Sequence, residues 1–495
     1  MSEVEERFDR RRRAVGLVLG PAACALLLAF PPDGLPSPAA RLSAVVAWVL
    51  VWWITEPVPI PVTALLGPAL TVVLGVWGAR EAFAPFGDPI IFLFLGSFLL
   101  AEAMSVHGVD RRVATSLLSS RLVGGSPGRA VTAFAVLAAG ASMWLSNTAT
   151  TAMLYPIALG VLAALSRKAR AGSEGPSRYA TGLLLVCAYG SSIGGVGTPV
   201  GTPPNLVALG QLKTLAGITV PFLSWMLLAV PISAAVLVFA LLYVRVFVVR
   251  EPAGARRPGA PFEVSREGTS PMSPGEKAAT AAFALAAFLW VVPGLLSLAG
   301  GRFGAAGKAI SEALPESVVA LLAGTLLFLL PGGGGRRALT WEEAARIDWG
   351  TLLLFGGGLS LGGAMFNTGL AETFGRALTD ATGARSTVAL TFLFSVFAIW
   401  FTEVTSNTAT ATMLVPLAIA SARAAGVSPL EPAIGCAIGC SMAFMLPVAT
   451  PPNAIVYGSG LVPIGRMART GFWMNVGSSI LVPLGVLLLV PLVLR

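Results

Sequence analysis

The chain has 495 residues, of which 55% are hydrophobic and 12% are charged. A soluble domain usually carries about 25% charged residues, so this composition argues against a soluble globular protein. The net charge of +9 is typical of the Lys and Arg excess in the cytoplasmic loops of membrane proteins, and we therefore expect no nucleic-acid partner.

Long apolar segments recur along the chain and predict transmembrane helices, each of which needs about 20 residues to cross a bilayer. Residues 1–13 are strongly charged, and no small-residue cleavage site closes the apolar run that follows. We therefore expect this run to be retained as a helix and not removed as a signal peptide. About eleven transmembrane helices are predicted, near residues 14–30, 41–55, 59–78, 90–108, 179–210, 219–249, 278–298, 317–331, 349–366, 430–460 and 471–494.

Two further apolar stretches, residues 130–165 and 386–421, are each interrupted at the centre by Ser-Asn-Thr. Each is too long for one plain span, and each is polar where lipid tolerates polarity least. We predict that both are re-entrant hairpins, in which two half-helices meet at a polar tip.

The segment Arg250–Ser273 is rich in Pro, Gly and charged residues and predicts a linker between two halves. The N-terminal half then covers residues 1–249, with the hairpin 130–165 and a broken helix at 179–210. The linker covers 250–277, and the C-terminal half covers 278–495, with the hairpin 386–421 and a broken helix at 430–460. A glycine run at 332–335 predicts a flexible turn.

The distribution of basic residues predicts the orientation of the chain. With the N-terminus in the cytoplasm and each hairpin entering and leaving on one side, 24 of the 33 Lys and Arg residues fall on the cytoplasmic side. This bias agrees with the positive-inside rule. We expect a multi-pass protein of the inner cell membrane whose two halves have inverted topologies.

Two motifs occur once in each half and in the same order. Ser146-Asn147-Thr148 is repeated as Ser406-Asn407-Thr408, and Thr202-Pro203-Pro204-Asn205 is repeated as Thr450-Pro451-Pro452-Asn453. Consecutive prolines break a helix and free backbone carbonyls. Interrupted helices in corresponding positions of inverted halves are typical of a midplane substrate site in a transporter. Single copies could be simple helix caps, but capping does not require two inverted copies.

The predicted hairpins and broken helices contain almost no charge. Residues 131–165, 179–210 and 432–465 have no Asp, Glu, Lys, Arg or His, and the second hairpin contains only Glu403. An anion would therefore be held by neutral donors and positive helix ends, and a hard cation by carbonyl and hydroxyl oxygens. The single histidine, His107, and the scattered cysteines predict no zinc or iron site and no cofactor.

These motifs resemble those of the divalent anion:sodium symporter family, and the resemblance covers nearly the whole chain. It implies a homodimer in which each protomer has a scaffold domain and a mobile transport domain that moves like an elevator. It also implies sodium as the coupling ion and a small divalent anion as the substrate, with C4-dicarboxylates such as succinate, fumarate and malate favoured.

The resemblance assigns site residues at the matching positions. The residues that contact the substrate are Ser146, Asn147, Thr148, Ser406, Asn407 and Thr408, with Thr202, Thr450 and Pro451 lining the same cavity. The first sodium site involves Ser142, Ser146, Asn147 and the backbone at Gly201. The second involves Thr402, Thr405, Asn407 and the backbone at Ala449.

Several alternatives remain open at this point. The same fold could exchange dicarboxylates without sodium, or could carry sulfate or citrate. A membrane-embedded enzyme would need a nucleophile, base or metal set, which the charge-poor motifs do not offer. An anion channel is disfavoured by the duplicated midplane hairpins. Glu403 is either a carrier of protons or cations or a residue that orients the hairpin tip.

Overall fold

The computed structural model describes residues 3–118, 126–166, 178–249 and 271–494. Most of the predicted linker 250–277 and most of the loop at 166–178 therefore lie outside the described residues. The longer helices are α1 Glu3–Ala29, α2 Ser37–Thr55, α3 Ile60–Val73, α5 Pro89–Val106, α7 Pro127–Ser142, α8 Asn147–Ser166, α9 Arg178–Gly195, α11 Phe222–Tyr243, α12 Pro274–Ala299, α16 Trp349–Asn367, α18 Thr387–Phe401, α19 Asn407–Ala424 and α22 Ile464–Val493.

Shorter helices connect these elements or flank a break. They are α4 Ala79–Phe83, α6 Val109–Leu118, α10 Pro203–Gln211, α13 Gly301–Ala313, α14 Glu316–Leu326, α15 Trp341–Ala344, α17 Leu370–Thr382, α20 Leu430–Cys440 and α21 Pro451–Tyr457, with single turns η1 Ala84–Gly87, η2 Leu212–Ala216 and η3 Val244–Val248. In the described part of the chain, the strands are β1 Pro331–Gly333 and β2 Arg336–Arg337, an antiparallel pair around the predicted glycine turn.

Among the described residues, seven helices are long and apolar enough to cross a membrane, or up to nine if each of two bent helix pairs counts as one span. The prediction of a polytopic all-α membrane protein is confirmed. The number is below the predicted eleven because α3, with 14 residues, and α14, with 11, are shorter than one span, and because the predicted helices 179–210 and 430–460 are each divided by a break. A span of about 20 residues is the usual requirement.

The helices form two compact units. Unit one contains Met1–Phe92, Leu206–Val220 and Asp348–Cys440, and unit two contains Leu93–Asn205, Pro221–Ile347 and Ser441–Arg495. Each unit draws on both sides of the predicted linker, so contacts in space do not follow the two halves of the sequence. The hairpin around Ser146 belongs to unit two, and the hairpin around Ser406 belongs to unit one.

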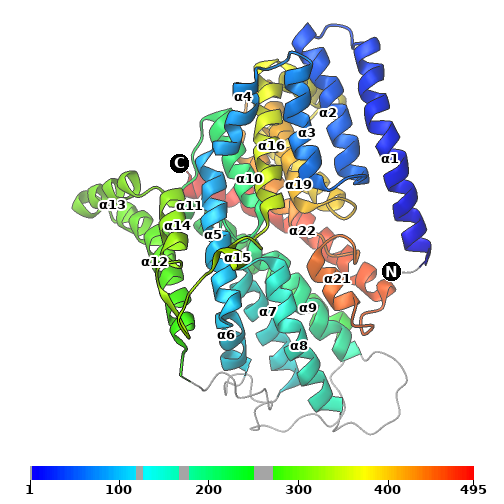
Figure 1. The fold of residues 1–495 in the computed structure, drawn as a ribbon. Coiled ribbons are helices and arrows are strands. Elements are labelled where there is room, and N and C mark those ends of the chain that lie inside the picture. The colour runs from blue at the N-terminus through cyan, green and yellow to red at the C-terminus, as the bar shows by residue number, and fades with distance from the viewer. Residues whose placement is uncertain (1–2, 119–125, 167–177, 250–270, 495) are drawn as a thin grey trace. The chain divides into compact units, whose positions relative to one another are not determined.

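In unit one, α2, α3, α16 and α19 pack around a buried apolar cluster (Figure 1). The cluster includes Val45, Val49, Ala64 and Leu361. Helix α16 approaches α3 at backbone distance, because a Cβ on Gly357 would overlap the carbonyl of Ala64. Helices α18 and α19 both pack on α20.

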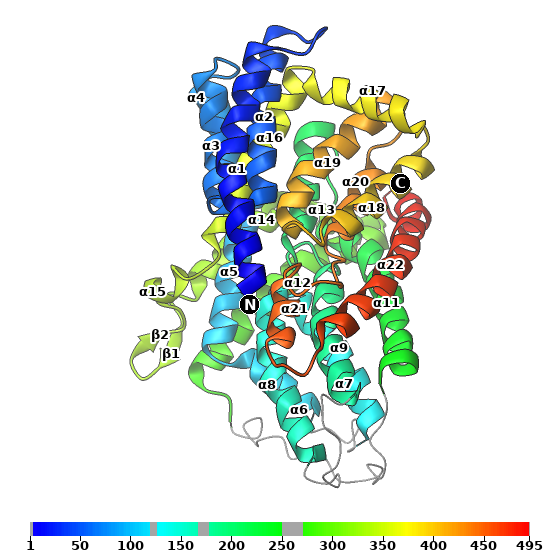
Figure 2. The ribbon, with the colours of Figure 1, turned by 90° about the vertical axis from the view of Figure 1, so that its right-hand side faces the viewer.

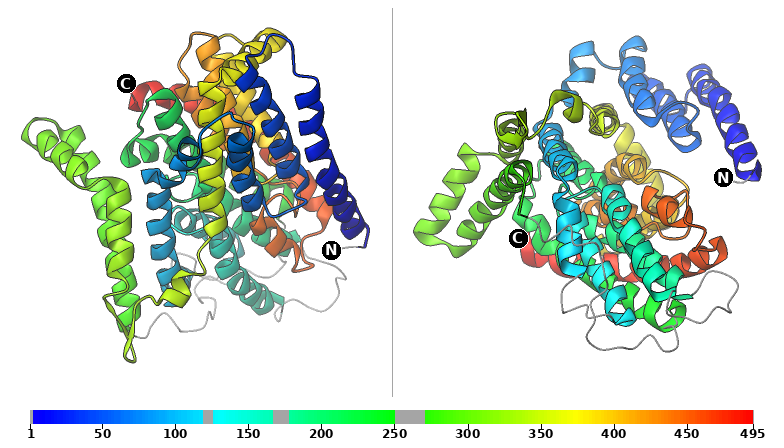
Figure 3. Two further views of the ribbon diagram at one scale, coloured as in Figure 1. Left: turned by 45° about the horizontal axis from the view of Figure 1, so that its top comes forward. Right: turned by 60° about the horizontal axis from the view of Figure 1, so that its bottom comes forward.

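In unit two, α7 and α8 both pack on α9, and α21 contacts α8 and α9 (Figure 2). Helix α11 packs on α22, and the two green helices α12 and α13 lie side by side (Figure 3). Helix α13 was not predicted, and neither was α17 in unit one. Both are short and carry several charged residues, so neither produces the long apolar run by which the other helices were recognised.

Candidate functional site

The first Ser-Asn-Thr motif lies at the tip of a helical hairpin in unit two. Helix α7 ends at Ser142 and α8 begins at Asn147. The two helices rest on α9, and small residues allow the backbones of α7 and α9 to touch. A Cβ on Gly190 would lie 2.8 Å from the carbonyl oxygen of Ala135, and one on Gly194 would overlap the carbonyl of Ala139. This close packing fixes the position of the tip relative to α9.

Within this tip, the side chains of Ser142 and Asn147 are joined. The fully buried Ser142 Oγ donates a hydrogen bond to Asn147 Oδ1 over 2.6 Å. The amide N–H of Ala149 donates to Ser146 Oγ over 3.1 Å. Ser146 and Thr148 are exposed. The tip thus has an inner pair of oxygens and an outer pair of hydroxyls that remain accessible.

The first break lies between Gly195, where α9 ends, and Pro203, where α10 begins. Its backbone is in direct contact with the tip. A Cβ on Gly201 would lie 2.9 Å from the carbonyl oxygen of Ser142, and one on Gly195 would overlap Asn147 Oδ1. The structure therefore brings together Ser142, Asn147 and Gly201. Thr202 is buried in the same turn, with 2% of its surface exposed.

The second Ser-Asn-Thr motif repeats this geometry in unit one. Thr402 Oγ1 lies 2.7 Å from Asn407 Oδ1 and 2.9 Å from the carbonyl oxygen of Cys440, at the end of α20, and its single proton can bond to either. Thr405 Oγ1 lies 2.6 Å from Thr410 Oγ1. Helix α18 approaches α20 as α7 approaches α9, since a Cβ on Gly439 would lie 2.7 Å from the carbonyl oxygen of Ser395.

Ser406, Asn407 and Thr408 are half-buried at the start of α19. The side chain of Ser406 does not cap this helix. The first backbone N–H groups of a helix have no partner within it and carry partial positive charge. The beginning of α19 can therefore donate hydrogen bonds to a carboxylate or sulfate.

The second break lies between Cys440 and Pro451 and belongs to unit two from Ser441 onward. Thr450 Oγ1 accepts a hydrogen bond from the Asn453 N–H over 3.3 Å, which caps α21. Ala449 and Thr450 are buried, and Pro451 is exposed. The residues predicted for the second sodium site are thus divided, with Thr402, Thr405 and Asn407 in unit one and Ala449 in unit two.

A family model described as the sodium:sulfate symporter transmembrane region matches residues 12–494. The chain belongs to this family. The resemblance inferred from the two duplicated motifs is thereby confirmed.

Curated relatives of this symporter include two named sodium-dependent dicarboxylate transporter SdcS. The protein from Staphylococcus saprophyticus is 36% identical over 489 residues, covering 97% of this chain and 92% of the relative. The protein from Staphylococcus aureus strain USA300 is 34% identical, with the same coverage.

Two solved structures resemble the symporter in fold. The Alcanivorax borkumensis YdaH transporter has a TM-score of 0.57 at 18% identity and covers 91% of this chain and 98% of its own. Neisseria gonorrhoeae MtrF has a TM-score of 0.50 at 13% identity, with 94% and 96% coverage. At these identities the likeness concerns the fold alone.

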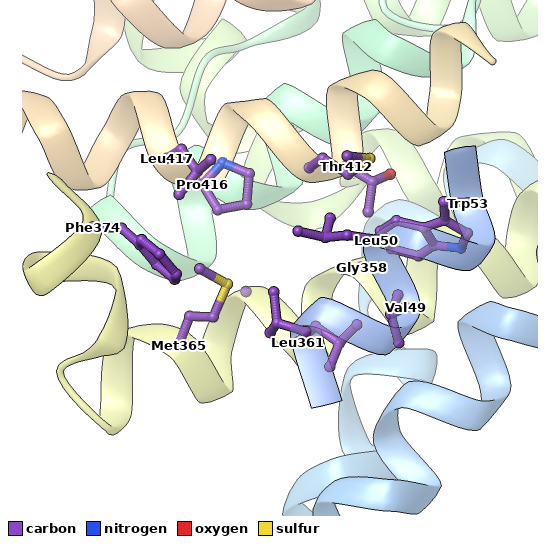
Figure 4. A pocket seen from close by; sticks show the side chains of 13 residues that line it. Val49, Leu50, Trp53, Gly358, Leu361, Met365, Phe374, Thr412, Pro416 and Leu417 are labelled. Carbon is purple, nitrogen blue, oxygen red and sulfur yellow. The ribbon is translucent and has the colours of Figure 1, made fainter. Parts of the chain in front are cut away.

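A pocket of about 130 Å³ in unit one is lined by residues other than those of the hairpin tip (Figure 4). Its walls come from α2, α16, α17 and α19, and its side chains include Trp53, Leu361, Met365 and Phe374. The hydroxyl of Thr412, which also lines it, donates to the carbonyl of Thr408 over 2.8 Å. The lining is almost entirely apolar, so a divalent anion would lose more hydration there than the few polar groups could replace, and this pocket does not suit the symporter's substrate.

Some contacts of the symporter's tips involve residues outside the predicted site. Thr198 Oγ1 donates to the carbonyl of Met143 and so ties the first break to the first tip. Thr410 pairs with Thr405 in the second tip. The counterpart of Thr198 in the second break is Leu446, so the repeat gave no signal for it. Thr410 lies two residues after the second motif, and only its contact distinguishes it from the other hydroxyl residues nearby.

Proposed function

We propose that this symporter carries C4-dicarboxylates into the cell together with sodium. The observation that supports this most directly is the duplicated tip, in which a hydroxyl oxygen lies 2.6 Å from the amide oxygen of the motif asparagine in one copy and 2.7 Å from it in the other. The curated relatives are named as sodium-dependent dicarboxylate transporters and extend over almost the whole chain.

The two tips and the two breaks would share the binding of the anion. The outer hydroxyls and N–H groups are neutral donors, which suit a dianion that must be released again. We assign this role to Ser146, Asn147, Thr148, Ser406, Asn407 and Thr408, with Thr202, Thr450 and Pro451 lining the cavity.

The inner oxygens would hold sodium. Ser142 and Asn147 lie against the backbone of Gly201, so hydroxyl, amide and carbonyl oxygens converge there. Such neutral oxygens are the ligands that a hard monovalent cation prefers. We assign the first ion to Ser142, Ser146, Asn147 and Gly201, and the second to Thr402, Thr405, Asn407 and Ala449.

Each tip joins the two half-helices of its hairpin, so an ion bound at the tip would fix the orientation of both half-helices. In the proposed cycle, sodium binds first and orders the tips, the dicarboxylate follows, and a transport domain carries both across as an elevator within a homodimer. The inverted halves 1–249 and 278–495 would provide the inward-facing and outward-facing states by symmetry. The N-terminus would lie in the cytoplasm and the protein in the inner cell membrane.

Uptake of radiolabelled succinate into proteoliposomes tests this assignment through two variants, Asn147→Ala and Asn407→Ala. Each removes a side-chain amide whose oxygen is a proposed ion ligand and whose NH₂ group is a proposed donor to the substrate, so uptake should fall by about tenfold or more, since a charge-assisted hydrogen bond contributes about 1.5–3 kcal/mol. Asn367→Ala, at the exposed end of α16, is the matched control. If both motif variants were present at normal protein levels and took up succinate at the wild-type rate, the site assignment would be wrong.

A further inference from the structure

The two asparagines that close the Pro-Pro-Asn motifs reach back across their breaks in the same way. Asn205 Nδ2 lies 3.1 Å from the carbonyl oxygen of Gly195 and 2.7 Å from that of Thr198. Asn453 Nδ2 lies 3.3 Å from the carbonyl oxygen of Ala443 and 3.0 Å from that of Leu446. In both copies the partners stand ten and seven residues before the asparagine.

The orientation of each side-chain amide follows from its neighbours. Every contact of Nδ2 is a carbonyl oxygen, which only accepts hydrogen bonds, so the NH₂ group must face these carbonyls. Asn205 Nδ2 has a third such neighbour, the carbonyl of Val196 at 3.2 Å. Both asparagines are fully buried, and neither Oδ1 has a hydrogen-bond partner in the described part of the chain. The donor side of the amide is used, and the acceptor side is not.

The breaks need such a donor. Where a helix is interrupted, its last carbonyls lose their partners four residues ahead, and a buried carbonyl without a partner costs about 1–3 kcal/mol. The two prolines that follow have no N–H to offer. The side chain of the asparagine directly after them supplies the hydrogen bond to Gly195 or Ala443. It also adds a second donor to Thr198 or Leu446, whose carbonyls accept from the N–H of Gly201 or Ala449 as well. By bonding to two carbonyls at once, it fixes the curvature of the turn.

The carbonyls that are held lie next to the proposed sodium ligands. A Cβ on Gly201 would overlap the oxygen of Gly195, which is the oxygen that Asn205 holds. In the second break, Leu446 accepts hydrogen bonds from both Asn453 Nδ2 and the N–H of Ala449, the latter at 3.2 Å. A change in either turn would therefore move the backbone at Gly201 or Ala449.

We propose that Asn205 and Asn453 are positioning residues for the coupling ions, and that their amide N–H groups hold the two breaks in the conformation that sodium binds. This inference rests on the sodium coupling proposed above. The asparagines themselves do not contact sodium; they hold the turns that do. Without them, sodium binding would have to order the turn as well, which would weaken the binding.

The variants Asn205→Asp and Asn453→Asp separate this role from that of a direct ion ligand. Aspartate keeps the shape and the free oxygen but loses the N–H donors and turns an oxygen toward the carbonyls. If the asparagines hold the turns, the sodium concentration for half-maximal succinate uptake should rise about tenfold, the equivalent of 1.4 kcal/mol. If Oδ1 is itself a sodium ligand, the added negative charge should leave that concentration unchanged or lower it, which would overturn the proposal.

The pH profile supplies a second readout of the lost hydrogen-bond donor. A protonated carboxyl has an O–H and can donate one hydrogen bond to a carbonyl. The uptake of each variant, divided by that of the wild type at the same pH, should therefore be higher at pH 5.5 than at pH 8. The exposed Asn367→Asp is the matched control and should show neither effect.

The two breaks should respond unequally. Gly194 and Gly195 end α9 and Gly197 lies in the first break, whereas Ala443–Leu446 in the second break include no glycine, so the first break gains more backbone freedom when released. Asn205→Asp should therefore raise the sodium concentration for half-maximal uptake more than Asn453→Asp does. If the Asn205→Asp variant does not fold, Asn453→Asp still tests the proposal. If the wild type needs sodium for uptake and a folded variant needs the same sodium concentration for half-maximal uptake, this inference alone is overturned. Sodium-independent uptake in the wild type overturns the proposed function together with it.

Discussion

Replacing Gly194 with alanine should separate α7 from α9. Gly194 faces α7, and the added Cβ would lie closer to the carbonyl and Cα of Ala139 than the 3.0 Å that real Cβ atoms keep. The atoms in the way belong to the backbone, so no side-chain rotation can relieve the overlap. The two helices would have to move apart along their most closely packed face.

The magnitude follows from two opposing effects. Overpacking in a close-packed interior destabilises by about 1–3 kcal/mol. Alanine is a better helix former than glycine by about 1 kcal/mol, which offsets part of this loss. The net expectation is a loss of stability of up to about 2 kcal/mol. Because α7 ends at Ser142, its displacement should also move Ser142 away from the backbone of Gly201 and weaken sodium binding.

The assay compares Gly194→Ala with Gly140→Ala. Gly140 lies on α7, is exposed, and has no atom within 4 Å of the position that a Cβ would take. The control should be neutral or slightly stabilised, whereas Gly194→Ala should unfold at a lower temperature in detergent and need more sodium for half-maximal uptake. Equal unfolding temperatures and equal sodium dependence in the two variants would refute the packing argument.

Two further predictions follow from individual contacts. Ser142→Ala and Thr402→Ala each remove the hydroxyl that bonds the motif asparagine, so half-maximal uptake should need severalfold more sodium, given about 1 kcal/mol per hydrogen bond. The conservative Ser142→Thr and Thr402→Ser variants keep the hydroxyl and should retain most of the uptake activity. Alanine variants with unchanged sodium dependence would show that these hydroxyls do not contribute to sodium binding. Although burial raises the pKa of Glu343, the Thr340 N–H and the Arg336 guanidinium hold that pKa below its ordinary value overall. This stabilisation of the loop around α15 should be present above about pH 4.3 and be lost as the pH falls through the lower folded pKa. Limited proteolysis should show earlier cleavage there in acid for the wild type, and pH-independent cleavage for Glu343→Gln; a wild-type loop that is equally resistant at both pH values would contradict this.

The sequence predicted the elements around the tips closely. The hairpin expected at 130–165 corresponds to α7 and α8, and the one expected at 386–421 corresponds to α18 and α19. The Pro-Pro pairs placed both breaks, since two prolines in succession cannot continue a helix. These features are local, so they can be read from the residues that form them.

Other features depend on residues far apart in the chain. The grouping of Leu206–Val220 with Asp348–Cys440 in unit one results from tertiary packing, and no local pattern predicts it. The hydrogen bond from Thr198 to the carbonyl of Met143 depends on how α9 lies against α7. Short charged helices such as α17 escape recognition because their apolar residues occupy only one face.

Uptake of labelled succinate by the purified wild-type protein distinguishes sodium symport from exchange. Proteoliposomes would be prepared empty or preloaded with unlabelled succinate, each with and without an inward sodium gradient. Sodium symport predicts uptake into empty vesicles only when sodium is present outside. Uptake that depends on internal succinate and ignores sodium would contradict it and indicate exchange, and no succinate uptake under any condition would reject C4-dicarboxylates as the substrate.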